Sequence, residues 1–369
     1  MVVRAAVLRE IGSPLRVEDV VLAPPGPGAV EVRLAATGVC HSDLSVRDGT
    51  IPQPTPAVLG HEGAGVVTRL GPDVTGLAVG DHVVLSWVAP CRRCAFCLGG
   101  QAELCVHGID HHFGPPYGTA GGDPVVCAMG TGTFAESTVV PEAAAIRIDP
   151  DFPLDLAALV GCAVVTGVGA VVNVAGVAPG DTVAVVGCGG IGLSAVQGAR
   201  LAGASRIVAV DRIPAKLELA RANGATDVVD AGDDPLGAVR ALTGGLGVDH
   251  AIEAVGSSAT IATAYALARR GGAVTVVGAG AFDDPWSIPA MNLMVDAKRV
   301  QGCVFGGTDP ARDIPRVIAL ARHGALDLER LVSRRITLDA VNDAFDDMVA
   351  GEIARSLVVF DPPAATDAA

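Results

Sequence analysis

The chain has 369 residues, of which 50% are apolar, 18% charged and 3% aromatic, and its formal net charge is −14. This length suits two domains, and the composition is that of a globular protein. No run of Lys or Arg is available to neutralise phosphates, and no stretch reaches the roughly 18 apolar residues of a membrane span. We therefore expect a cytoplasmic protein that binds neither nucleic acid nor membrane.

The N-terminal part predicts an irregular β-rich domain. From Val2 to about Ile148, Gly and Pro interrupt the sequence at short intervals, and apolar runs lie between them at 29–34, 65–69 and 82–87. Such punctuation is typical of short strands. Cys40 and His61 lie in this part, and each taken singly is more typical of an ordinary core residue than of a metal ligand.

A run of four cysteines follows, at Cys91, Cys94, Cys97 and Cys105. Four closely spaced thiols in a reducing compartment favour metal ligation over disulfides. They can close a tetrahedral zinc site that stabilises structure and has no open position for chemistry. An iron–sulfur cluster or adventitious thiols are the alternatives that spacing leaves open.

From about Asp155 the pattern changes to Ala-rich helical segments that alternate with Val-rich runs. The runs lie at 183–186, 207–210, 251–255 and 274–277. This alternation predicts a parallel sheet with helices on both faces. Cys162, at the start of this part, lies among Ala and Val and looks like a core residue.

A glycine-rich loop follows the first of these strands and opens a helix near Ile191. Its sequence is Gly187-Cys188-Gly189-Gly190-Ile191-Gly192. These glycines permit a tight turn and close approach of a pyrophosphate to the helix N-terminus. Asp211 ends the next strand, where an acid binds the ribose 2′-hydroxyl and repels a 2′-phosphate, so NAD is favoured over NADP. Arg212 weakens that preference slightly.

The regular alternation stops near Gly302. We expect a helix over 313–323, a strand over 333–337, a helix over 338–350 and a last strand over 356–360 that returns to the first domain. The predicted fold is α/β, with a β-rich domain (1–163), a Rossmann doubly wound parallel-sheet domain (164–304) and a return to the first domain (305–369).

Several motifs together resemble one family. Gly60-His61-Glu62-Gly63-Ala64-Gly65 is similar to the signature of zinc-containing alcohol dehydrogenases of the medium-chain dehydrogenase/reductase superfamily, and the resemblance is closest to the class III-like branch. Other motifs come in the family's order over essentially the whole chain: 38–43, the four-cysteine run, Gly161-Cys162 with Thr166-Gly167, the glycine-rich loop and Ala354-Arg355-Ser356. The resemblance implies a GroES-like catalytic domain beside the Rossmann domain.

The resemblance also implies two zinc ions per subunit and NAD. It assigns Cys40, His61 and Cys162 to a catalytic zinc with an open fourth position, and the four-cysteine run to a structural zinc. Asp43 would orient His61, Glu62 would support the site, and Ser42 would take the alcohol proton. The implied reaction is zinc-assisted deprotonation of an alcohol and hydride transfer to NAD. The residues expected to contact NAD are His41, Thr166, Gly187, Gly189, Gly190, Ile191, Gly192, Asp211, Arg212, Lys216, Val277 and Arg355.

One position departs from the family. Well-known members carry a histidine three residues after the relay hydroxyl, and here that position is Ser45. His41 is adjacent, but its expected pyrophosphate contact argues against a second duty. We therefore expect the outer part of the proton relay to run through water.

Ile51, Trp87 and Phe134 match positions that line the family's substrate pocket, which implies an apolar site for small alcohols or aldehydes. A thiol-dependent formaldehyde dehydrogenase of the class III type is the alternative. A non-catalytic dinucleotide-binding structural or sensor protein is an alternative of another class. Family members are commonly homodimers or homotetramers.

Three histidines follow the fourth cysteine of the run, and we interpret them as solvated imidazoles of a surface loop: His107, His111 and His112. The remaining cysteines, Cys127, Cys188 and Cys303, are interpreted as small core residues. The acidic pairs at 233–234 and 346–347 are interpreted as solvated faces.

Overall fold

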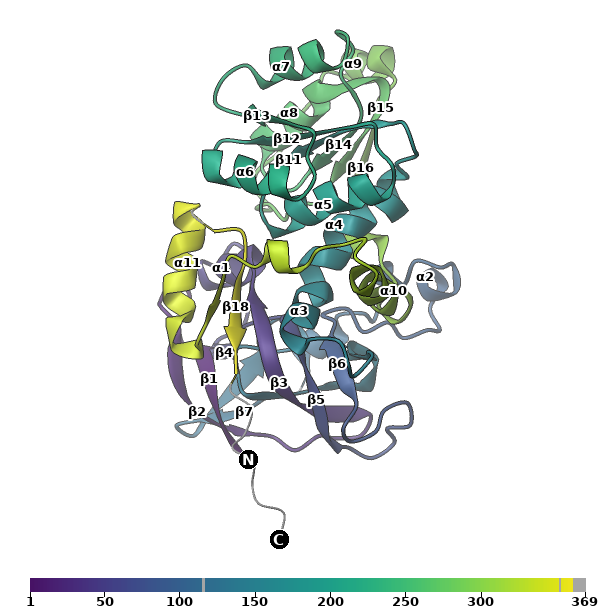
Figure 1. The fold of residues 1–369 in the computed structure, drawn as a ribbon. Coiled ribbons are helices and arrows are strands. Elements are labelled where there is room, and N and C mark those ends of the chain that lie inside the picture. Colours follow the sequence, from purple (N-terminus) through teal and green to yellow (C-terminus); the bar gives the residue numbers. More distant parts are fainter. Residues whose placement is uncertain (115–116, 352, 361–369) are drawn as a thin grey trace.

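The computed structural model describes residues 1–114, 117–351 and 353–360. The N-terminal part folds into a closed barrel and a second sheet, which together form the β-rich half (Figure 1). The barrel joins β1 (Val2–Leu8), β2 (Arg16–Leu22), β7 (Gly118–Ala120), β8 (Asp123–Cys127) and β4 (Ala57–Val58). The seven-stranded sheet joins β10 (Ala145–Arg147), β6 (His82–Leu85), β5 (Glu62–Leu70), β3 (Ala29–Val39), β18 (Ser356–Val359) and β17 (Arg334–Ile336), with β9 (Ser137–Pro141) also paired to β3.

The three strands expected in this half are confirmed, with different ends. β3 runs to Val39, and β6 stops at Leu85, before Trp87. Just after β6, the backbone N–H of Ser86 donates to the carbonyl of Ala144, and its hydroxyl donates to the carbonyl of Val88 at 2.7 Å. The chain therefore turns just before Trp87.

The second half is one six-stranded parallel sheet in the order β13-β12-β11-β14-β15-β16. Its strands are β11 (Thr182–Val186), β12 (Arg206–Asp211), β13 (Asp227–Asp230), β14 (Val248–Glu253), β15 (Ala268–Val276) and β16 (Arg299–Gly302). The helices around it are α5 (Gly190–Leu201), α6 (Pro214–Ala222), α7 (Pro235–Leu242), α8 (Ser258–Leu267) and α9 (Ala290–Asp296). This order confirms the doubly wound Rossmann sheet, and its reversal beside β11 is the place where such sheets bind ligands.

A long helical run links the two halves in Figure 1. It consists of α3 (Leu154–Leu159), α4 (Val165–Gly169) and the π-type turns 160–164 and 170–175. The run Leu154–Ala175 is apolar and long enough to cross a membrane, which differs from the expectation from the sequence, but 83% of its apolar 18-residue window is buried inside the protein, as is typical of a core helix. The domain boundary expected at 163/164 falls inside this run, which is continuous because both halves pack against it.

The C-terminal segment returns to the β-rich half, as expected (Figure 1, yellow beside purple). α10 (Pro310–Arg322) starts three residues earlier than expected, because the side chain of Asp309 caps it by accepting from the N–H of Ala311. α11 (Val341–Ala350) follows, and β18 pairs antiparallel with β3.

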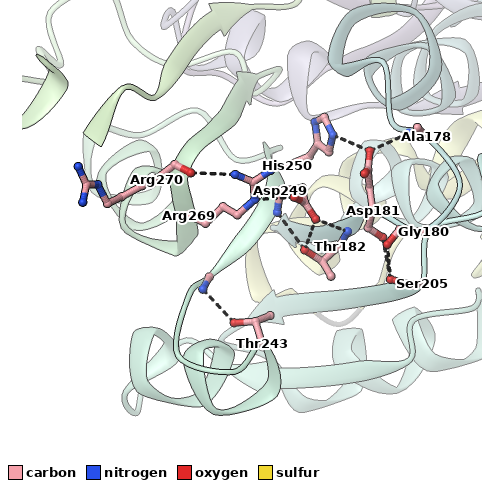
Figure 2. A network of polar contacts seen from close by, with 11 residues as sticks. Ala178, Gly180, Asp181, Thr182, Ser205, Thr243, Asp249, His250, Arg269 and Arg270 are labelled. Atoms are coloured by element: carbon pink, nitrogen blue, oxygen red, sulfur yellow. Dashed lines mark hydrogen bonds and ion pairs between the residues drawn. The ribbon is translucent and has the colours of Figure 1, made fainter. Parts of the chain in front are cut away.

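Figure 2 shows a polar network at the amino ends of β11 and β14. Asp249 accepts from the N–H of Thr182 at 2.8 Å, from its hydroxyl at 2.7 Å, and from Arg269 Nε at 2.6 Å. Beside it, His250 Nε2 lies 3.1 Å from a carboxylate oxygen of Asp181. These contacts tie the strand starts together at the edge opposite the glycine-rich loop, so this network supports the sheet and leaves the ligand edge free.

Candidate active site and metal centres

The four-cysteine run folds into one lobe around the short helix α2 (Ala95–Leu98). The four sulfur atoms all lie within 4.8 Å of one another. Backbone N–H groups of Cys97 and Val106 donate to Cys94 and lower the pKa of its thiol to about 6, which favours the thiolate that zinc binds. Four sulfur ligands and no other donor in the cluster fit a closed structural zinc site.

Three separate elements bring Cys40, His61 and Cys162 together. Cys40 lies between β3 and α1 (His41–Arg47), His61 precedes β5, and Cys162 lies in the first π-type turn of the helical run. The three are buried, and one ligand atom of each lies within 4.8 Å of the others. β3 and β5 are antiparallel neighbours, so the end of one meets the start of the other. The sequence interpretation could join these residues only through resemblance, and the structure brings them together.

Asp43 fixes the ring of His61. One oxygen of its carboxylate lies 2.9 Å from His61 Nδ1 and accepts from the N–H of Gly60 at 3.1 Å, while the other accepts from the N–H of Cys40 at 3.1 Å. With Nδ1 facing a carboxylate, Nε2 is left as an acceptor. This Nε2 is buried and has no hydrogen-bond partner among the described residues. A buried acceptor beside two thiols fits a zinc ion.

Glu62 and Arg355 form a buried ion pair next to this cluster, with Oε1 and Nη1 3.2 Å apart. Burial raises the pKa of Glu62 to about 7, although Arg355 opposes the shift. A carboxylate oxygen of Glu62 also lies within 4.8 Å of the ligand atoms of the three residues above. The structure thus places Glu62 within ligand range, closer than the supporting role that the resemblance implies.

The glycine-rich loop joins β11 to α5 as expected. Gly187 has φ +93°, a conformation that favours glycine. A Cβ at Gly192 would meet the carbonyl oxygen of Gly187, and one at Gly190 would meet the guanidinium of Arg355. The close turn leaves the first N–H groups of α5 available to phosphate. Arg355 also contacts Glu62, so one side chain joins the dinucleotide loop to the metal cluster.

Asp211 ends β12 beside this loop. Its carboxylate accepts from the N–H of Cys188 at 2.7 Å and from that of Ile213 at 3.0 Å. These bonds hold the acid at the carboxyl end of the sheet, where a ribose binds in this fold. The other residues expected to contact NAD lie on the elements around the loop: His41 begins α1, Thr166 lies in α4, Ile191 in α5, Arg212 after β12, Lys216 in α6 and Val277 after β15.

The expected pocket residues separate into two groups. Trp87 is partly buried, and its indole lies edge-on to Phe305, with ring centroids 5.2 Å apart. Ile51 is partly buried against the core of the β-rich half. Phe134 has no exposed surface, and its ring lies 6.2 Å from that of Phe345. Phe134 belongs to the buried core of the β-rich half, and its place in the substrate pocket stays a prediction.

The histidine loop also differs from its interpretation. His107 is exposed and pairs with Asp110, as expected of a surface loop. His112 is partly buried and its Nε2 bonds the carbonyl of Trp87 at 2.8 Å, while both ring nitrogens of His111 are buried. The interpretation of these two as solvated is wrong, because the loop folds over Trp87. No local pattern in the sequence signals this contact or that of Phe305.

The relay residues differ in their distance from the cluster. The hydroxyl of Ser42 lies 3.8 Å from the sulfur of Cys40. Ser45 lies one turn further along α1 and is partly buried. Ser42 alone of the two therefore has a described contact with the cluster.

Comparison with known proteins identifies the family. The family described as "Alcohol dehydrogenase GroES-like domain" matches residues 26–150, and "Zinc-binding dehydrogenase" matches residues 190–322. An S-(hydroxymethyl)glutathione dehydrogenase of Synechocystis sp. is 40% identical over 366 residues, covering 96% of this chain and 99% of the relative.

Two solved structures are similar over their whole length. An alcohol dehydrogenase zinc-binding domain protein from Burkholderia ambifaria has a TM-score of 0.93 and 36% identity, covering 98% of this chain and 100% of that one. Benzyl alcohol dehydrogenase from Acinetobacter calcoaceticus has a TM-score of 0.90 and 33% identity, with the same coverage. The chain belongs to the zinc-dependent alcohol dehydrogenases of the medium-chain dehydrogenase/reductase superfamily, oxidoreductases that work with zinc and NAD.

Proposed function

We propose that this chain oxidises primary alcohols to aldehydes, and reduces aldehydes in reverse, by hydride transfer to and from NAD. The observation that carries the proposal is the buried cluster of Cys40, His61 and Cys162, which Arg355 connects to the dinucleotide loop. A purely structural protein has no use for buried ligand atoms placed beside a cofactor loop.

Each residue of the cluster has a distinct part in this reaction. Zinc held by Cys40, His61 and Cys162 supplies a Lewis acid that lowers the pKa of an alcohol hydroxyl. Asp43 holds the imidazole so that Nε2 faces the cluster. Ser42 lies beside Cys40 and would accept the alcohol proton while its own hydroxyl proton passes to solvent through water.

We assign NAD rather than NADP to the dinucleotide site. Asp211 is fixed at the end of β12 by two N–H groups, and a carboxylate there pairs with ribose hydroxyls and repels a phosphate. Arg212 follows it, and its side chain is exposed. We expect kcat/KM to be higher with NAD than with NADP.

The substrate wall favours a hydrocarbon or aromatic tail. Trp87 is a partly buried aromatic side chain, and the buried ring of Phe305 supports it edge-on. Arg92, the first of two basic residues that follow Trp87 in the chain, is engaged by both carboxylate oxygens of Asp309. The charge of Arg92 is thus already paired within the protein and is less available to an anionic thiol adduct.

The second candidate is oxidation of an S-hydroxymethyl thiol. It is favoured by the 40% identity to proteins named S-(hydroxymethyl)glutathione dehydrogenase. Thiol adducts of formaldehyde are themselves primary alcohols, so the same cluster serves both reactions.

One panel of assays separates these candidates. Benzyl alcohol, short aliphatic alcohols and formaldehyde are tested with NAD and with NADP, each with and without a low-molecular-weight thiol. We expect activity with benzyl alcohol and NAD in the absence of thiol. Activity only with formaldehyde and thiol would move the second candidate to first place, and no activity with any substrate would favour a structural or sensor protein.

We further propose a cytoplasmic homodimer or homotetramer. All nine cysteines are free of disulfides, as suits a reducing compartment. α9 exposes Met291, Met294 and Val295 beside β16, which is the edge strand of the parallel sheet. Light scattering tests the oligomer, and a monomer at micromolar concentration would contradict it.

A further inference from the structure

The turn between β16 and α10 lies between the four-cysteine lobe and the aromatic substrate wall. This segment, residues 305–309, begins with Phe305 and ends with Asp309. The lobe reaches one end of it through Arg92, and Trp87 contacts the other end. The contacts of this segment determine whether a change in the four-cysteine lobe can alter the position of Trp87.

Arg92 joins the lobe to the segment. Its backbone N–H donates to the thiol of Cys97, and its φ of +61° lies in the left-handed region. Its guanidinium reaches the two oxygens of Asp309 at 2.7 and 2.8 Å, a two-point contact that fixes orientation as well as distance. One residue thus bonds to a zinc-ligand sulfur by its backbone and to the segment by its side chain.

The segment itself is seated firmly. Asp309 caps α10, and its own N–H donates to the carboxylate of Asp313 at 2.9 Å. Gly306 lies so close to the helical run that a Cβ there would meet the carbonyl of Val165. Thr308 is fully buried. The segment therefore has little room to change its conformation, so a displacement of Asp309 is expected to move Phe305 as well.

Phe305 transmits this position to the wall. It has φ +50°, unusual for a residue with a side chain, and such a conformation persists where the surroundings hold it. Its ring lies at 73° to the indole of Trp87, and the main-chain carbonyl of Trp87 is held by a hydrogen bond from His112. Trp87 lies two residues after Leu85, whose carbonyl lies against Gly161, the neighbour of Cys162. The wall thus adjoins the metal cluster.

We propose that Arg92 is a positioning residue for the substrate wall. By holding Asp309 it fixes Phe305, and through Phe305 it sets the orientation of the Trp87 indole. The four-cysteine lobe thereby contributes to selection of the alcohol's tail in addition to stability. The specificity part of this inference rests on the proposed function, and the indole part does not.

Intrinsic fluorescence provides a test that needs no activity. The chain has two tryptophans, so a Trp286→Phe parent leaves Trp87 as the only tryptophan, which is excited selectively over the two tyrosines. Arg92→Gln and Asp309→Asn are made in this parent. The control is Arg335→Gln, because Arg335 makes a similar two-point contact with Glu329 at 2.8 and 2.8 Å and its side chain is 40% exposed, against 46% for Arg92. Arg335 also contacts Asp155, so this substitution removes more ion-pair contacts than Arg92→Gln does.

We expect both test variants to shift the emission of Trp87 to longer wavelength and to increase its quenching by acrylamide, while the control matches the parent. The KM for benzyl alcohol should rise about fivefold, the upper range for a partly exposed ion pair, with kcat and the KM for NAD nearly unchanged. Arg92→Lys keeps the charge but loses the two-point geometry and should fall between parent and Arg92→Gln.

Two results would overturn the proposal. One is unchanged Trp87 emission in folded, zinc-loaded Arg92→Gln, and the other is an equal shift in Arg335→Gln, which would indicate general destabilisation. The parent could also fail to oxidise any alcohol while Arg92→Gln still shifts the emission of Trp87. That result would contradict the proposed function and would support the link from Arg92 to the indole.

Discussion

The chain builds its two cysteine clusters in opposite ways. The four-cysteine lobe takes its ligands from one loop, and most of them are only partly buried. The second cluster takes Cys40, His61 and Cys162 from three elements far apart in sequence, and all three are buried. Local spacing is enough to define a closed site, whereas a reactive site requires the tertiary fold to exclude water and orient each ligand.

The groups that support the two clusters also come from one loop in the lobe and from separate elements at the buried cluster. Donors to sulfur in the lobe are backbone N–H groups of its own loop. The buried cluster is instead supported by Asp43 from α1 and by Arg355 from the start of the last strand. We therefore expect substitutions at the buried cluster to change turnover, and those at the lobe to change stability and the substrate wall.

The largest effect is expected for His61→Ala. It removes the imidazole ligand and leaves Asp43 without its partner. Loss of Lewis-acid stabilisation worth several kcal/mol corresponds to a fall in kcat of roughly 10³-fold or more. Steady-state kinetics, with circular dichroism to confirm folding, checks this. A folded variant with more than a tenth of normal turnover would remove the cluster from the reaction.

The next largest effect is expected in the proton relay, where the two serines of α1 should respond differently to substitution. Ser42→Ala should lower kcat by about 10²-fold or more, because the residue beside Cys40 no longer accepts the proton. Ser45→Ala should stay near the wild type, because the outer relay is assigned to water. Stopped-flow kinetics across pH measures both variants. Comparable losses would sink the assignment of Ser42.

Cys94→Ser tests the closed site. We expect zinc content to fall from two ions per chain toward one, because the remaining three sulfurs cannot complete a tetrahedral site. The melting temperature should drop, while kcat at low temperature stays within about tenfold, since ligand changes confined to the lobe leave the Lewis acid in place. A loss of turnover as large as that of His61→Ala would erase the distinction between the clusters.

The smallest effect is expected at the network in Figure 2. Burial raises the pKa of Asp249, but the hydrogen bonds from Thr182 and Arg269 outweigh burial. The pKa of Asp249 therefore lies below its ordinary value of 3.8. A lowered folded-state pKa gives stability that is present above the unfolded pKa and is lost as pH falls through the folded value. Asp249→Asn should therefore cost about 1 kcal/mol at pH 7.

Urea unfolding checks this cost, and the difference from wild type should shrink below about pH 4. The turnover of folded Asp249→Asn should match the wild type, because the network lies at the edge opposite the cofactor loop. A change in the KM for NAD would contradict the structural role.

Regular periodicity allowed much of the fold to be predicted from sequence. The runs at 183–186 and 207–210 became β11 and β12, and the last strand returned to β3 as expected. The four-cysteine lobe was predictable because its ligands are neighbours in the chain. Cys162 was not predictable from the residues alone, because its partners lie more than 100 positions away.

The substrate wall was the least predictable region. Phe305 and His112 meet Trp87 through non-local contacts that no spacing signals. Phe134 is buried beside Phe345, a contact that no spacing in the sequence indicates. Side-chain direction at the end of a short strand depends on packing partners that the sequence alone does not identify.

Anomalous scattering at the zinc absorption edge tests the central claim most directly. Crystals of the full chain grown with zinc and NAD should show two anomalous peaks per chain. One should lie among the four cysteines of the lobe and the other among Cys40, His61 and Cys162. A single peak in the lobe, with none at the buried cluster, would contradict the account and favour a protein that keeps zinc for structure alone.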